Sequence, residues 1–124
     1  METISNCLFV GAGGMFGAIA RYLMGLLPLR LQNGFPLITL GINLLGAFCI
    51  GLIAAQAGKN PSIDPRLLLL LKVGICGGFT TFSTFSLEAL TLLQSGKYLV
   101  GLSYMILSTA LCVAAAAAAQ ILVK

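Results

Sequence analysis

The chain has 124 residues, of which 59% are hydrophobic and only 8% charged, with a formal net charge of +4. A water-soluble domain cannot cover its surface with so few charged side chains, so the composition predicts a protein embedded in a lipid bilayer. The absence of histidine, together with only three acidic residues, leaves no evident acid–base pair for catalysis. We therefore expect neither an enzyme nor a partner of nucleic acid.

Four apolar stretches are long enough to cross a bilayer as α-helices, which takes roughly 20 residues each. They run over Ile4–Leu27, Leu37–Ala57, Leu67–Leu93 and Tyr98–Val123. The three connections between them are short and contain Pro or Gly. The sequence therefore predicts an all-α membrane protein with one four-helix transmembrane domain over residues 1–124.

Glycines in the first span are similar to a dinucleotide-binding loop, but Phe16 stands where that loop requires glycine. Inside a membrane, Gly13-x-x-x-Gly17 predicts instead a face that packs closely against a neighbouring helix, as does Ala47-x-x-x-Gly51 in the second span. Arg21 lies near the end of the first span. It either draws anions into a vestibule or extends toward the headgroups.

Polar side chains form stripes on the second and fourth spans. Thr39 and Asn43 are four residues apart and share a helix face. Tyr104, Ser108 and Cys112 recur at the same interval. Isolated hydroxyl groups in membrane helices usually bond to their own helix or to a neighbour. Stripes on several spans together favour a conduit lined with hydrogen-bond donors.

The third span is interrupted by the string Gly77-Gly78-Phe79-Thr80-Thr81-Phe82-Ser83-Thr84-Phe85-Ser86. In hydrocarbon every backbone polar group needs a partner, so irregular backbone is tolerated only where it is buried in protein or lines a polar cavity. The string predicts a helix broken near Gly77–Thr80, at an ion or solute site. A donor-rich conduit with no acid at its centre favours an anion, as do the positive edges of phenyl rings.

The basic residues are nearly balanced across the membrane. One side holds Lys59, Arg66, Lys72 and Lys124, and the other holds Arg21, Arg30 and Lys97. This difference is too small to set an orientation by the positive-inside rule. It is compatible with insertion in both orientations and an antiparallel homodimer, and equally with chance. Four helices also leave little room for a polar conduit sealed from lipid within one copy, so we expect an oligomer.

The interrupted third span resembles the signature of the small Fluc (CrcB-type) fluoride channels. Gly14-x-x-Gly17-Ala18-x-x-Arg21-Tyr22 and Gly41-x-Asn43-x-x-Gly46 also match, so the resemblance covers the whole chain. It implies an antiparallel dual-topology homodimer in a bacterial inner membrane. Two pores in that dimer would export cytoplasmic fluoride passively.

The resemblance also implies residue roles. Phe82 and Phe85 would face the pores, and the amide of Asn43 would donate to the ion. Ser83 and Thr84 are weaker candidates beside them. With the stripe residues added, the predicted fluoride-pore residues are Thr39, Asn43, Phe82, Ser83, Thr84, Phe85, Tyr104, Ser108 and Cys112. Cys112 departs from the hydroxyl residue common at its position and is a weaker donor.

The resemblance further implies a structural sodium ion on the dimer axis. The backbone carbonyls of Gly77 and Thr80 from both copies would hold it, which is sensible because an unwound helix exposes carbonyls to a small hard cation.

A different class stays open from the residues alone, a small dual-topology exporter of multidrug cations coupled to protons. Such proteins need a carboxylate in the membrane. Here Glu88 is the sole candidate, and it could equally face a pore mouth or a helix interface.

Overall fold

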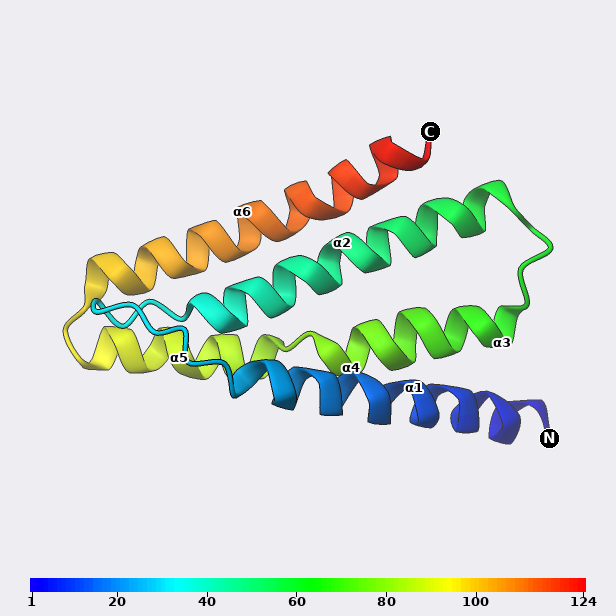
Figure 1. Ribbon diagram of the computed structural model, residues 1–124, viewed down its shortest axis with the longest axis horizontal. Coiled ribbons are helices and arrows are strands. Elements are labelled where there is room, and N and C mark those ends of the chain that lie inside the picture. The colour runs from blue at the N-terminus through cyan, green and yellow to red at the C-terminus, as the bar shows by residue number, and fades with distance from the viewer.

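The computed structural model describes residues 1–124 as a bundle of long helices with both chain termini at the same end (Figure 1). In chain order the elements are α1 (Glu2–Gly25), α2 (Leu37–Lys59), α3 (Pro65–Leu68), η1 (Leu69–Cys76), α4 (Gly77–Phe79), α5 (Phe82–Gln94) and α6 (Tyr98–Val123). The four membrane-spanning stretches are Glu2–Gly25, Leu37–Lys59, Pro65–Gln94 and Tyr98–Val123. The prediction of four spans is confirmed, and its boundaries are right to within a few residues.

The helix ends follow from local sequence. Asp64 begins the third span as an N-cap: its carboxylate accepts a hydrogen bond from the Arg66 N–H at 2.8 Å, and Pro65 occupies the first helical position. Gly34 and Gly96 have φ of 81° and 79°, a left-handed conformation that glycine adopts without strain. These two turns therefore define the connections at the end of the bundle opposite the termini.

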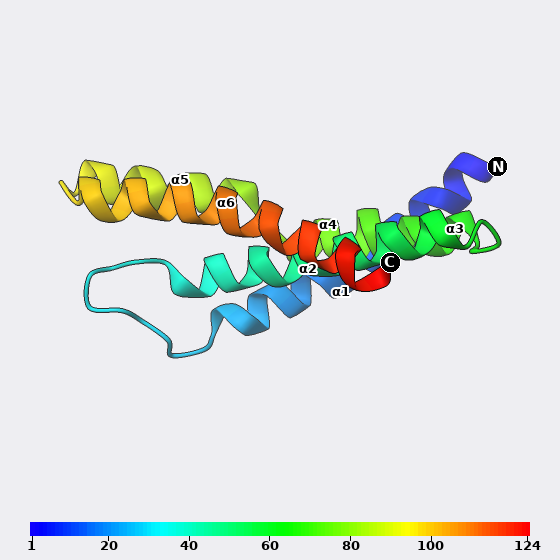
Figure 2. The same cartoon turned by 90° about the horizontal axis from the view of Figure 1, so that it is seen from above.

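Two helix pairs make up the bundle: α2 lies along α6, and α1 lies along η1 and α4 (Figures 1 and 2). Glycine sets how closely each pair approaches. A Cβ on Gly13 would meet the Gly74 Cα at 2.9 Å, and one on Gly51 would meet the Ala116 carbonyl oxygen at 2.6 Å. The close-packing faces predicted at these glycines are confirmed, because only a residue without a Cβ allows such backbone contact.

The break in the third span lies at Thr80 and Thr81, which are extended with ψ of 159° and 118°. The prediction of a helix broken near Gly77–Thr80 is confirmed at Thr80, whereas the two glycines of that stretch remain helical. Gly77 is helical with φ of −65°, and Gly78 belongs to α4, where a Cβ would meet the Gly14 oxygen at 2.7 Å. The glycines thus permit contact with α1, whereas the threonines carry the irregular backbone.

A π-helical stretch, η1, precedes the break. Its wide turns shift the register of the residues that follow, and such turns are frequent at functional sites. Nothing in the stretch Leu69–Cys76 indicates it, since the sequence there is compatible with an ordinary α-helix.

Few residues of the chain are buried: only 15 of the 124. A small cluster of Leu40, Ala89, Leu92 and Tyr104 joins α2, α5 and α6. Many large apolar side chains are exposed, as expected for helices that face lipid.

We predict that Gly17→Ala destabilises the protein by about 1–3 kcal/mol, the usual cost of overpacking. The added methyl group would meet the backbone nitrogen of Phe79 at 2.7 Å, so α1 would have to move away from α4. The measurement is the melting temperature of the purified protein in detergent. Gly11→Ala is the matched control on the same helix, because nothing in the chain lies within 4 Å of its Cβ position. Equal melting temperatures for the two variants would contradict this account of the packing.

Candidate functional site

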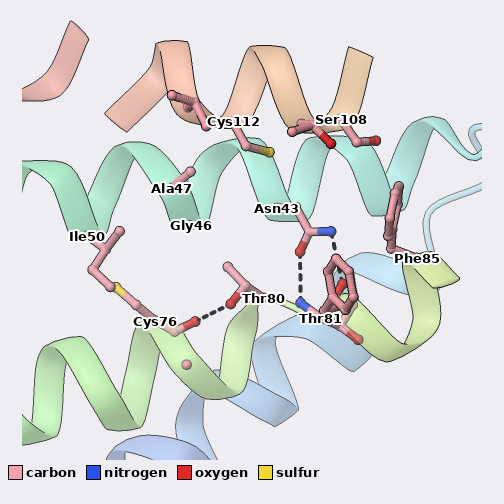
Figure 3. A pocket seen from close by; sticks show the side chains of 14 residues that line it. Asn43, Gly46, Ala47, Ile50, Cys76, Thr80, Thr81, Phe85, Ser108 and Cys112 are labelled. Carbon is pink, nitrogen blue, oxygen red and sulfur yellow. Dashed lines mark hydrogen bonds between the residues drawn. The ribbon is translucent and has the colours of Figure 1, made fainter. Parts of the chain in front are cut away.

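The side chain of Asn43 holds the break through two hydrogen bonds to the backbone of Thr81 (Figure 3). Its Nδ2 donates to the Thr81 carbonyl oxygen at 3.0 Å, and its Oδ1 accepts from the Thr81 N–H at 2.8 Å. An amide side chain reproduces in this way the pairing that a backbone neighbour would supply in a sheet. The contact satisfies both polar groups of an extended residue at membrane depth.

The two threonines of the break satisfy further groups. The Thr80 N–H and hydroxyl both donate to the Cys76 oxygen, at 3.0 and 2.9 Å. The Thr81 hydroxyl accepts from the Thr84 N–H at 3.1 Å and so caps the N-terminus of α5. Sequence reasoning missed this role of Thr81. Its signal was available, because a threonine directly before a new helical segment is a preferred N-cap.

A cavity of about 410 Å³ lies between α2, the break and α6. It is lined by Asn43, Gly46, Ala47, Ile50, Cys76, Gly77, Thr80, Thr81, Phe82, Phe85, Ser108, Thr109, Cys112 and Val113. None of these residues carries a charge. The predicted pore residues Asn43, Phe82, Phe85, Ser108 and Cys112 are therefore brought together in one neutral cavity.

Ser108 is the one buried side chain whose polar atom has no hydrogen-bond partner in the chain. It is only 6% exposed, and it lies on α6 beside α2, the helix that carries Asn43 (Figure 3). Asn43 has a second amide hydrogen beyond the one that it donates to Thr81. The cavity thus holds donors that the protein itself does not use.

Aromatic rings border this cavity. Phe82 and Phe85 have centroids 5.5 Å apart with planes tilted by 40°, and Phe85 is 5.1 Å from the ring of Tyr104. Phe82 is 79% exposed, so the cavity reaches the surface of the chain on that side. Tilted rings present edges as well as faces to their surroundings, and the edge carries partial positive charge.

Thr39 and Tyr104 do not line this cavity. Both form hydrogen bonds to Glu88 instead. The Thr39 hydroxyl donates to Glu88 Oε2, and the Tyr104 hydroxyl donates to Glu88 Oε1, each at 3.1 Å. Tyr104 is fully buried. The carboxylate consequently joins α5 to α2 and α6. Of the two places that the sequence left open, Glu88 lies at a helix interface, and it also borders an open cavity, described next.

A second cavity, of about 770 Å³, opens where the end of α1 and the first connection face α5. Arg21, Arg30, Thr84 and Glu88 are among its lining residues. The sequence analysis did not predict Arg30 as a site residue. A basic residue in a connection, next to the end of a span, could have indicated it. Ser83 is exposed and lines neither cavity; its hydroxyl lies 3.4 Å from that of Thr81.

The chain is similar to known proteins over nearly all of its length. The family described as CrcB-like protein, Camphor Resistance (CrcB), matches residues 8–120. A fluoride-specific ion channel FluC of Ruminiclostridium cellulolyticum is 42% identical over 100% of this chain and 96% of the relative. The FluC of Rhizobium meliloti is 39% identical over 98% of both chains. That of Chlorobaculum tepidum is 45% identical over 82% of this chain and 80% of the relative.

We predict that Asn43→Ala destabilises the protein by about 1–3 kcal/mol, because it leaves both polar groups of Thr81 without a partner. Melting temperature in detergent is the measurement. Ser108→Ala is the control: its hydroxyl bonds to nothing in the chain, so its removal should leave the melting temperature near that of the unaltered protein. If Ser108→Ala lowered the melting temperature as much as Asn43→Ala, the two hydrogen bonds from Asn43 to Thr81 would not be what stabilises the break.

Proposed function

The chain belongs to the CrcB family, and we infer from this membership that it is a fluoride-specific ion channel. It is a multi-pass protein of a bacterial membrane, and a transport protein rather than an enzyme. Within the chain, the observation that supports this function best is the neutral cavity between α2, the break and α6, whose lining includes Ser108 with its unpartnered hydroxyl.

The chemistry of that cavity suits a small, strongly hydrated anion. Such an ion leaves water only when other donors replace its hydration shell. The free hydroxyl of Ser108, the second amide hydrogen of Asn43 and the edges of the phenyl rings can do so. Since no lining residue is charged, the ion is not held so tightly that it cannot leave, which conduction requires.

The pore path that we propose passes through this cavity. Phe82 and Phe85 face the ion, and Asn43 and Ser108 donate to it. Cys112 continues the line along α6 as a weaker donor. All five line the cavity.

The remaining predicted pore residues have supporting places. Thr39 and Tyr104 act through Glu88, which accepts hydrogen bonds from both, and Thr39 and Glu88 both line the second cavity. Thr84 and Arg21 line the second cavity, which we propose is the vestibule of the pore. Ser83 is the weakest candidate among the predicted pore residues, since it lines neither cavity.

We propose further that the channel is an antiparallel dual-topology homodimer with two pores, through which cytoplasmic fluoride leaves passively. Three features support a second copy. The cavity is open beside the highly exposed Phe82, one copy buries few of its residues, and the basic residues are balanced between the two sides.

A structural sodium ion is compatible with the break. The Thr80 carbonyl oxygen accepts no hydrogen bond in the chain. Gly77 lacks its helical donor, because the Thr81 N–H bonds to Asn43 instead. Backbone oxygens are suitable ligands for a hard cation. The carbonyls of Gly77 and Thr80 from two copies would hold sodium, which would neutralise their partial negative charge where the copies meet.

The alternative, a proton-coupled exporter of multidrug cations, is not supported. The relatives are fluoride channels, and Glu88, the one carboxylate such an exporter could use, is engaged by two hydroxyl donors.

We predict rapid, uncoupled loss of fluoride from liposomes that contain the purified protein, with little loss of chloride. A fluoride-selective electrode and a parallel chloride electrode measure the two fluxes, and protein-free liposomes give the background. Absence of fluoride flux from a verified dimer in sodium buffer, or fluoride loss that requires a proton gradient, would overturn the channel assignment.

We predict that Ser108→Ala slows fluoride efflux by about tenfold, because a hydrogen bond to a charged group contributes roughly 1.5–3 kcal/mol. Thr109→Ala is the matched control. It is the next residue and lines the same cavity, but its hydroxyl already donates to the Met105 oxygen at 2.9 Å. Its removal should change efflux little. If both variants conduct alike, Ser108 does not bind the ion.

A further inference from the structure

We propose that Arg21 is a positioning residue of the channel: its guanidinium holds the carbonyl end of α4 and thereby sets where the break lies. The inference rests on the proposed function, since the break lines the cavity through which fluoride is proposed to pass. It assigns to Arg21 a task other than attracting anions, which needs only a charge in the vestibule.

Arg21 reaches α4 because glycines bring α1 close to it. Gly13, Gly17 and Arg21 follow at intervals of four residues and lie on one face of α1. A Cβ at Gly17 would meet the Phe79 nitrogen at 2.7 Å, so the two backbones are in contact at that point. One turn further along α1, the same face presents Arg21 where α4 ends at Phe79.

The Arg21 side chain takes the place of a missing backbone donor. In a continuous helix the Gly78 carbonyl would accept from the Phe82 N–H, four residues later. The extended Thr80 and Thr81 separate these two residues. Instead, Arg21 Nε donates to the Gly78 oxygen at 3.1 Å in a partly buried position. A cation here also compensates the negative end of the helix dipole.

The neighbouring carbonyls make this bond more important. The Cys76 oxygen has two donors, both from Thr80, whereas Gly77 has lost its helical donor because Thr81 pairs with α2. Without the guanidinium, the Gly78 carbonyl would also lack a partner at membrane depth, where an unsatisfied group is costly. The last helical turn before the break would then lose its order. The part of the cavity lining next to that turn would become disordered as well.

The two possible tasks of Arg21 differ physically. Arg21 and Arg30 both line the second cavity, and attraction of anions from solution acts at a distance and is screened by salt. A hydrogen bond at contact distance in a partly buried place is screened far less. Arg30 makes no side-chain hydrogen bond, so it serves as a control that has the charge without the contact.

The test is amide hydrogen–deuterium exchange of the reconstituted protein, read on peptides that cover residues 78–84. We expect Arg21→Met, which keeps a long side chain without charge or donor, to exchange about tenfold faster there. Arg30→Met should exchange like the unaltered protein. Arg21→Lys should restore slow exchange, because its Nζ lies one bond beyond the position of Arg Nε and reaches the same oxygen. Unchanged exchange in Arg21→Met would overturn the proposal.

Fluoride efflux at low and high salt gives a second readout. We expect Arg21→Met to slow efflux by a similar factor at both salt concentrations, while exchange in α6 stays unchanged, so that a global loss of stability is excluded. A defect that disappears at high salt, as for a charge that only attracts anions, would overturn the proposal. If the unaltered protein itself conducts no fluoride, the proposed function fails, yet the exchange experiment still decides the role of Arg21.

Discussion

Two hydrogen bonds between the Asn43 side chain and the Thr81 backbone make the irregular step of the third span possible. Extended backbone inside a membrane is excluded unless its N–H and C=O find partners, and an amide side chain on a neighbouring helix supplies both at once. The helix can therefore end at Phe79 and begin again at Phe82. The cavity, the position of the phenyl rings and the exposed carbonyls all depend on that interruption.

Close approach of the helices is the second condition. The glycines of α1 and of the η1–α4 segment let backbone touch backbone, and this brings Arg21 to the Gly78 carbonyl. Between α2 and α6 the same device at Gly51 holds the polar stripe of α6 against the helix that carries Asn43. Residues with donors left over after this pairing, above all Ser108, line the neutral cavity through which fluoride is proposed to pass.

Sequence reasoning was right about the number of spans and the existence of a break, and it placed the break only approximately. The predicted stretch Gly77–Thr80 includes the extended Thr80, but its two glycines remain helical, and Gly78 serves contact with α1. Equal spacing likewise suggested that Tyr104 belongs with Ser108 in one conduit. Helical spacing reports a shared face and not a shared partner, and the Glu88 carboxylate on α5 takes up the Tyr104 hydroxyl.

From the sequence alone, the apolar content, the four long runs and the interrupted third run determine that the protein crosses a membrane and contains irregular backbone at depth, because these follow from transfer energies and local propensity. The motifs also indicate the family. Only the tertiary structure decided which donors are spent and which are free: Asn43 on Thr81, Thr39 and Tyr104 on Glu88, Ser108 on nothing. A hydrogen bond between helices depends on the distance between donor and acceptor, which is set by how the helices pack. Neither composition nor periodicity determines that distance.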